Sequence, residues 1–329
     1  MVAVAPTAAM RKSLRIATRT TELALRRSRA VQTMLETQGI TSELVLVRTD
    51  GDKHHDTPFR SDGAIALFAH ELEQSLLRKR ADLAVHAYAD LPAAASPGLA
   101  IGGVLERGDP RDALVLNALF EGTTIAELPN GTRIGTSTIR CRALLAALYP
   151  NVEAVQLRGD LPERLRKVDD GQVHATIAPA DALHRLDVPQ RIAAYLEAPA
   201  WLPAPTQGVI ALQIREADAE LAETLAALSH ARTRIDAAAE RAFFAALEGG
   251  SHSTVSALVV ETGGMRVLHG LIADPDGRTI LRDRHALEDE QPELDGIRLA
   301  NALRAKGASR LLDQLRRADR VPTPQPDSV

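Results

Sequence analysis

Four arginines stand where predicted strands end or the next helices begin, namely Arg19, Arg140, Arg158 and Arg164. Arg19 closes the apolar segment LRIATR, and Arg140 follows the turn-like segment GTST at 135–138. Because the guanidinium group is a planar fork that binds carboxylates in a bidentate manner, four of them at one cleft favour a ligand with several carboxylates. Taken singly, each is explained equally well as an ordinary exposed arginine.

Asp90 follows the apolar segment ADLAVH at 81–86, again at the carboxyl end of a predicted strand. A carboxylate in that place can stabilise a developing cation or transfer a proton. From the residues alone, a turn residue ahead of Leu-Pro is the simpler interpretation.

The sequence indicates no metal centre. His54 and His55 lie in a polar loop without partners at ligand spacing, and the chain has a single cysteine, Cys141. One cysteine can form no intrachain disulfide, so a reducing compartment fits the composition.

The elements that must position these residues alternate between strands and helices. Strands are predicted for the apolar segments 14–19, 43–47, 82–86, 113–116, 133–136, 153–157, 175–179 and 209–214, with helices between most of them. Such alternation predicts parallel sheets, in which ligands bind outside the carboxyl ends of the strands. The Pro-rich and Ala-rich segment 198–208 interrupts the second series, as a hinge between two domains would.

The last third of the chain has a different pattern. Three alternating segments at 256–261, 265–273 and 278–287 are separated by GlyGly and AspGly turns, which predicts an antiparallel meander. One closing helix is predicted over roughly 292–316. The fold class expected is therefore α/β: two parallel-sheet domains with a hinge, followed by an α+β domain.

Bulk properties exclude several classes of protein. The chain has 329 residues and a formal net charge of −4, which provides no positive field for a nucleic acid. No apolar run reaches the length of about 18 residues that a membrane span needs, and residues 1–12 lack the apolar core of a signal peptide. We expect a cytoplasmic protein with a disordered leader over 1–12 and a disordered tail over 319–329.

Ordered blocks along the chain resemble the hydroxymethylbilane synthase (porphobilinogen deaminase) family. They include LRIATR at 14–19, ADLAVH…DLP at 81–92, ERGDPRDALV at 106–115, IGTST at 134–138, LPAPTQGV at 202–209 and AER…LEGG at 239–250. Together the blocks extend over most of residues 13–318, which makes the resemblance far more specific than any one motif.

The resemblance implies a three-domain protein whose first two domains are similar to periplasmic binding proteins. We expect domain one over 13–108 plus 203–228, domain two over 109–202 and domain three over 229–318. The family condenses porphobilinogen with loss of ammonia and extends a dipyrromethane cofactor that is thioether-linked to a cysteine of the third domain.

The resemblance also implies roles for individual residues. Asp90 matches the catalytic aspartate. The substrate-binding and cofactor-binding positions are matched by Arg19, Thr136, Ser137, Arg140, Arg158, Gly159 and Arg164. Ser251 stands where the family has the anchoring cysteine, and a hydroxyl, which is scarcely ionised near neutral pH, adds poorly to a carbocation. The dipyrromethane is therefore expected by resemblance, with its covalent attachment in doubt.

Several cations of the family are replaced here. Ile65, His70 and Ala89 stand at positions that usually carry lysines, and Cys141 replaces the second arginine of an Arg-Arg pair. Arg27 replaces a customary glutamine and adds positive charge.

The sequence is compatible with two functions. The first is an enzyme that acts on porphobilinogen through Asp90 with impaired or altered activity, and the retained aspartate and arginines favour it. The second is a catalytically silent paralogue that binds a small carboxylate ligand or acts in regulation, and the lost cysteine and cations favour it. In either case we expect a monomer that binds neither nucleic acid nor membrane.

Overall fold

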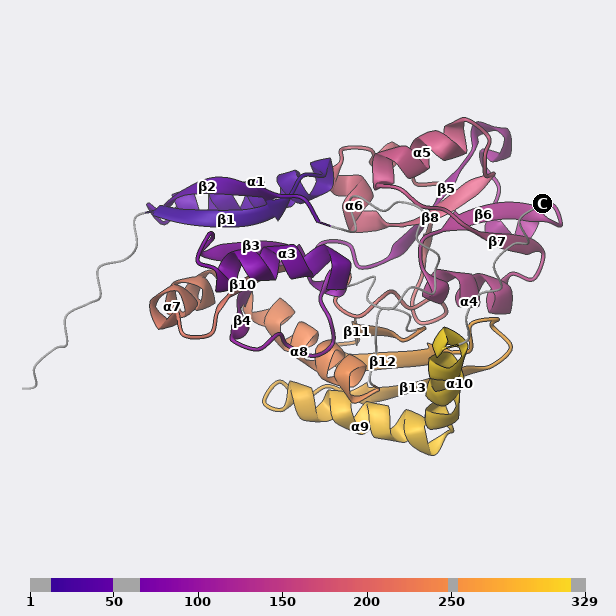
Figure 1. Ribbon diagram of the computed structural model, residues 1–329. Helices are drawn as coiled ribbons and strands as arrows, with labels where there is room; N and C mark the ends of the chain where they lie inside the picture. Colours follow the sequence, from indigo (N-terminus) through magenta and orange to yellow (C-terminus); the bar gives the residue numbers. More distant parts are fainter. Residues whose placement is uncertain (1–12, 50–65, 248–253, 321–329) are drawn as a thin grey trace, which may run out of the picture.

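The computed structural model of the chain describes residues 13–49, 66–247 and 254–320. Within these residues three separate sheets are present, and Figure 1 shows the first and second side by side, with the third below the second. The expected fold class, two parallel-rich α/β sheets followed by an antiparallel sheet with helices, is confirmed.

The first sheet has the strand order β2-β1-β3-β10-β4. Its strands are β1 (Ser13–Arg19), β2 (Thr41–Val47), β3 (Leu83–Ala87), β4 (Leu99–Val104) and β10 (Ile210–Arg215). Strands β1, β2 and β3 are parallel, whereas β10 runs antiparallel to both β3 and β4. The helices that follow these strands are α1 (Glu22–Glu36), α3 (Ala66–Leu77) and α7 (Ala219–Leu228). Strand β4 was not predicted, because the glycines in LAIGGV weaken the apolar signal.

The second sheet has the order β7-β6-β8-β5-β9. It contains β5 (Asp112–Leu116), β6 (Thr132–Thr136), β7 (Val152–Gln156), β8 (Ala175–Pro179) and the short β9 (Ala194–Leu196). Its helices are α4 (Ile139–Leu148), α5 (Leu161–Asp169) and α6 (Ala180–Arg185). Strand β6 is parallel to β7 and β8, and β5 is antiparallel to β8 and β9.

The third sheet is the predicted meander of β11 (Ser256–Thr262), β12 (Met265–Ala273) and β13 (Ile280–Ala286). Helices α8 (Ala231–Ala246), α9 (Pro292–Ala305) and α10 (Ala308–Arg320) pack with it. The prediction of one closing helix is wrong. Gly307 has a φ of 104°, a left-handed conformation that ends α9 and lets the chain start α10 in a new direction.

Two connections join the first and second sheets. The chain leaves β4 for β5 through residues 105–111 and returns from β9 to β10 through residues 197–209, which include the segment predicted to be a hinge. The connections are hydrogen-bonded to each other, since the Gly108 amide donates to the Gly208 carbonyl at 3.0 Å. Gly208 has a φ of 82°, and a Cβ there would lie 3.0 Å from the Gly108 carbonyl oxygen. Only glycine therefore fits this crossing.

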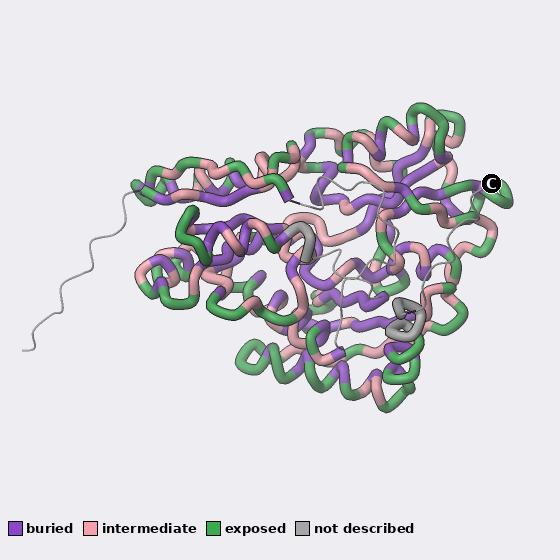
Figure 2. The backbone as a smooth tube through the Cα atoms, in the orientation of Figure 1, coloured by how far each residue is buried: buried purple, intermediate pink, exposed green. Residues whose placement is uncertain are grey.

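The second and third sheets share one hydrophobic core. It combines Leu114 and Ile134 of the second sheet with Leu258 and Leu271 of the third. Figure 2 shows buried residues along all three sheets, with exposed residues on the outer helices and turns. The β12–β13 turn lies against α4, where a Cβ on Gly277 would be 2.5 Å from the Ala143 carbonyl oxygen.

Among the described residues, no helix has both the length and the apolar character needed to cross a bilayer.

Candidate functional site

Arg19 and Asp90 lie at the same edge of the first sheet. Arg19 is the last residue of β1, and Asp90 ends a short 3-10 turn, η1 (Tyr88–Asp90), directly after β3. Because β1 and β3 are parallel neighbours, their carboxyl ends meet at one edge. Both side chains are partly exposed there.

The turn that carries Asp90 is held in place by helix α8. The Arg241 guanidinium donates to the carbonyl oxygen of Leu91 at 3.0 Å and to that of Pro92. It also lies over the Tyr88 ring, 5.0 Å from its centroid. The sequence analysis did not select Arg241 as a site residue. Its position in the AER…LEGG block, which resembles the family, could have indicated it.

The carboxyl edge of the second sheet gathers Thr136, Ser137 and Arg164. Thr136 ends β6 and is buried, and Ser137 follows it in the turn to α4. Arg164 projects from α5, is only 7% exposed, and donates from Nη1 to Ser137 Oγ at 3.2 Å. Burial lowers the pKa of Arg164, and its Nε has no hydrogen-bond partner among the described residues. A buried guanidinium with an unused donor favours an anionic ligand.

Arg158 and Gly159 form the bend between β7 and α5 in this same region. Burial lowers the pKa of Arg158, and the Arg158 carbonyl accepts a hydrogen bond from Lys167 Nζ at 2.9 Å. Gly159 has a φ of 109°, and a Cβ there would lie 2.4 Å from Glu163 Oε2. The bend therefore requires glycine.

Arg140 occupies a different environment from the other predicted arginines. Its Nη1 donates to Asp112 Oδ2 at 2.8 Å and to the Leu202 carbonyl at 3.0 Å. Asp112 also accepts from Trp201 Nε1 at 2.7 Å and from Gln207 Nε2 at 3.0 Å. Burial opposes the charge on Arg140, but its interactions, chiefly those with Asp112, together outweigh that effect and raise the pKa. In this structure Arg140 therefore ties α4 to the second sheet and to the returning connection.

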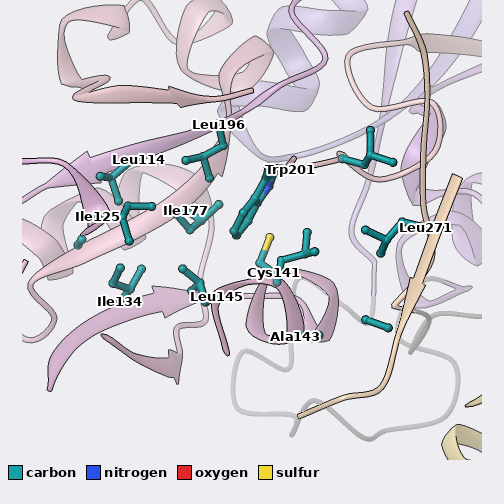
Figure 3. Close-up of a cluster of buried hydrophobic side chains, with 14 of the residues drawn as sticks. Leu114, Ile125, Ile134, Cys141, Ala143, Leu145, Ile177, Leu196, Trp201 and Leu271 are labelled. Atoms are coloured by element: carbon teal, nitrogen blue, oxygen red, sulfur yellow. The ribbon is translucent and has the colours of Figure 1, made fainter. Parts of the chain in front are cut away.

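Cys141 lies in the shared core beside Trp201, as Figure 3 shows. The residue is 4% exposed, and burial raises the pKa of its thiol although Arg140 acts in the opposite direction. A buried, protonated thiol is a poor nucleophile. Cys141 is therefore a poor substitute for an anchoring cysteine.

The remaining predicted positions are only partly described. Ser251 and Ile65 lie outside the described residues, whereas His70 is exposed on α3 and Ala89 lies in the η1 turn beside Asp90. Among the described residues no group of three His, Cys, Asp or Glu side chains is arranged to hold a metal ion.

Comparison with known proteins identifies the family. A family model described as "Porphobilinogen deaminase, dipyromethane cofactor binding domain" matches residues 14–223. A porphobilinogen deaminase of Xanthomonas oryzae pv. oryzae is 41% identical over 306 residues, which are 92% of this chain and 99% of the relative. Another from Syntrophotalea carbinolica is 39% identical over 314 residues, 95% of this chain and 98% of the relative. The chain belongs to the porphobilinogen deaminase family, whose members act in tetrapyrrole biosynthesis.

Solved structures also match, at a much weaker level. The VFT2 domain of Bordetella pertussis BvgS covers 65% of this chain and 85% of its own, with 18% identity and a TM-score of 0.41. The methionine-binding protein MetQ covers 65% of this chain and 90% of its own, with 12% identity and a TM-score of 0.40.

Proposed function

We propose that this chain binds porphobilinogen and condenses it with loss of ammonia, with Asp90 as the catalytic residue. The observation that carries the proposal is the placement of Asp90 at the carboxyl edge of the first sheet, where Arg19 also ends β1, on a turn that Arg241 fixes. We further propose that the three sheets belong to three domains, 13–108 plus 203–228, 109–202 and 229–318, and that the protein acts as a cytoplasmic monomer.

Asp90 suits the chemistry of this reaction. When the bond between the aminomethyl carbon and nitrogen breaks, the electron pair leaves with nitrogen and positive charge develops on the pyrrole. A fixed carboxylate stabilises that charge, and it can also hold the proton that the departing amine needs. Arg19 supplies positive charge nearby for the ligand's carboxylates.

The second sheet offers the residues that suit a dipyrromethane. Its carboxylates would be held by Arg164, Arg158 and the Ser137 hydroxyl, and the unused Nε of buried Arg164 is the observation that supports this fit. When bound, the dipyrromethane supplies the pyrrole carbon to which new units are joined. Because Ser251 replaces the cysteine and Cys141 is buried, we propose that it is held without a stable thioether and that activity is impaired or altered.

The decisive experiment follows ammonia release from porphobilinogen by purified protein. We expect slow release by the wild-type chain, and a loss of about 100-fold or more in Asp90→Asn, because general acid–base catalysis contributes about 10²–10⁴-fold. Asp170→Asn removes an exposed carboxylate from the end of α5 and serves as the matched control. No release by folded wild-type protein would contradict the proposal.

A silent binding protein is the second candidate, and the serine at position 251 together with the buried Cys141 favours it. This candidate predicts that porphobilinogen raises the melting temperature of the wild-type protein without any release of ammonia. An intact mass of the purified chain separates the cases further, since added dipyrrole mass would indicate covalent attachment.

A further inference from the structure

Helix α1 of the first sheet contacts helix α6 of the second (Figure 1). Leu23 of α1 packs against the core of the second sheet. Arg26 Nη1 donates to the Arg185 carbonyl at 2.9 Å and also pairs with Asp187, while its Nε and Nη2 bond to Glu22. These contacts fix the first turns of α1 against α6.

The next residue, Arg27, points into a group of charged side chains drawn from both sheets. Burial lowers the pKa of Arg27, and the positive charges of Arg185 and Arg19 lower it further. The carboxylates of Asp90 and Asp181 act in the opposite direction and raise it. The group holds three guanidiniums and two carboxylates, so its net charge is positive. Arg27 thus lies within electrostatic range of both the proposed catalytic carboxylate and Arg19.

No neighbour in the described part of the chain accepts a hydrogen bond from the Arg27 guanidinium. Its closest carboxylate oxygen is Asp181 Oδ2 at 3.9 Å, which is too long for a hydrogen bond. Asp181 is instead engaged by Arg185, whose Nε lies 2.9 Å from both of its oxygens. Among the described residues Arg27 therefore has no hydrogen-bonded acceptor for its guanidinium, although its side chain is still 16% exposed and can be reached by a small ligand.

A desolvated guanidinium with unused donors is a binding position for an anion, and its planar fork matches a carboxylate. Asp90, which lies within electrostatic range of Arg27, favours the opposite charge. A ligand that carries an amine and a carboxylate a few bonds apart would satisfy both residues, with its ammonium at Asp90 and its carboxylate at Arg27.

We propose that Arg27 binds a carboxylate of the pyrrole substrate and is a specificity-determining residue of this chain. The inference rests on the proposed function for the identity of the ligand. It assigns to this chain a cation that partly offsets those missing at positions 70 and 89.

The test uses a non-reactive probe, the pyrrole dicarboxylate that lacks the aminomethyl group, together with its dimethyl ester. Calorimetry measures binding of both compounds to wild-type protein, to Arg27→Gln and to Arg27→Lys. Arg29→Gln, an exposed arginine of the same helix, is the matched control. Melting temperatures show whether each variant is folded.

We expect Arg27→Gln to weaken binding of the dicarboxylate by about tenfold or more, since a charged hydrogen bond is lost. Arg27→Lys should lose less, Arg29→Gln should bind as wild type, and the ester should bind weakly and equally to all. If Arg27→Gln does not fold, the affinity of Arg27→Lys tests the proposal, because lysine keeps the positive charge and lacks the planar guanidinium group.

Equal affinity of wild-type protein and folded Arg27 variants for the dicarboxylate would overturn the inference, as would an absence of binding to wild-type protein. A variant with a lower melting temperature and unchanged affinity would show that Arg27 serves only the α1–α6 contact. The probe releases no ammonia, so its binding is measured independently of turnover. If the probe binds through Arg27 but the protein releases no ammonia from porphobilinogen, the proposed activity is wrong and this inference still holds.

Discussion

At the scale of the residue, burial shifts the pKa values of several charged side chains of this protein. Arg164 and Arg27 are cations whose pKa values are lowered by desolvation, while Arg140 is also buried but is paired with Asp112. The paired arginine contributes to the fold, because removing either partner would leave a buried charge uncompensated. Of these three, the two incompletely paired arginines are better suited to bind a ligand.

His86 on β3 provides a prediction on pH dependence. The side chain is 6% exposed, and burial lowers its pKa to about 4. Between pH 4 and pH 6.5 the unfolded chain therefore binds a proton that the folded chain does not, so the free energy of unfolding falls as pH decreases through that window. The loss should reach about 3 kcal/mol at the acidic end.

Urea unfolding at several pH values measures this effect. The difference in unfolding free energy between wild-type protein and His86→Gln should change steadily below about pH 6.5, because the variant lacks the titrating group. A difference that is independent of pH would show that His86 does not titrate as its burial implies.

At the scale of the element, helix α8 contacts the turn that carries Asp90, the two connections between the first and second sheets, and the third sheet. Arg241 binds the turn after Asp90, whereas the neighbouring Glu240 faces the connections between the first two sheets. The Glu240 carboxylate is fully buried and accepts hydrogen bonds from Arg107 Nη1 at 2.6 Å, the Thr206 amide at 2.6 Å and the Val259 amide at 2.9 Å. One carboxylate thus joins both connections to β11.

Replacing Glu240 with glutamine should be strongly destabilising. The variant leaves Arg107 without its buried partner and can satisfy only some of the amides, which costs about 3–5 kcal/mol of unfolding free energy. Chemical denaturation measures the loss, with the exposed Glu223→Gln on α7 as a control that should change by less than about 0.5 kcal/mol. A Glu240→Gln variant as stable as its control would contradict this account of the two connections.

At the scale of the whole molecule, the second and third sheets are a single packing unit. Their shared core includes Leu271 of β12 and Cys141 of α4, and the Arg142–Asp276 pair at 2.7 Å adds a contact at its edge. The first sheet is joined to this unit by the paired connections, by α8 and by the α1–α6 contact. Relative motion of the sheets therefore has to occur between the first sheet and the other two.

Leu271→Ala tests this division. Leu271 is fully buried, so truncation should cost about 2–5 kcal/mol. Hydrogen exchange should become faster in both α4 and β11–β13, because the two sheets lose a common core. Leu119→Ala, at a residue that is 87% exposed, is the control and should have little effect. Faster exchange confined to the third sheet would show that the cores are independent.

Much of the fold could be predicted because periodicity is a local property. The apolar segments predicted the three strands of the meander and most strands of the first two sheets, and the alternation with helices predicted parallel pairing. The antiparallel direction of β10 depends on the path of the connection that precedes it. The break between α9 and α10 depends on the φ angle of Gly307. Neither leaves a reliable local signal.

The sequence by itself determined which chemical groups are present: a carboxylate after one strand, arginines at the ends of others, and a serine at position 251. Tertiary structure alone decided how each group is used. Arg140 is a buried partner of Asp112, and Cys141 is part of a hydrophobic core. Arg27, on helix α1, lies within electrostatic range of Asp90. The physical reason is that solvation and pairing of a charge are set by neighbours distant in the chain, which residue type and spacing do not specify.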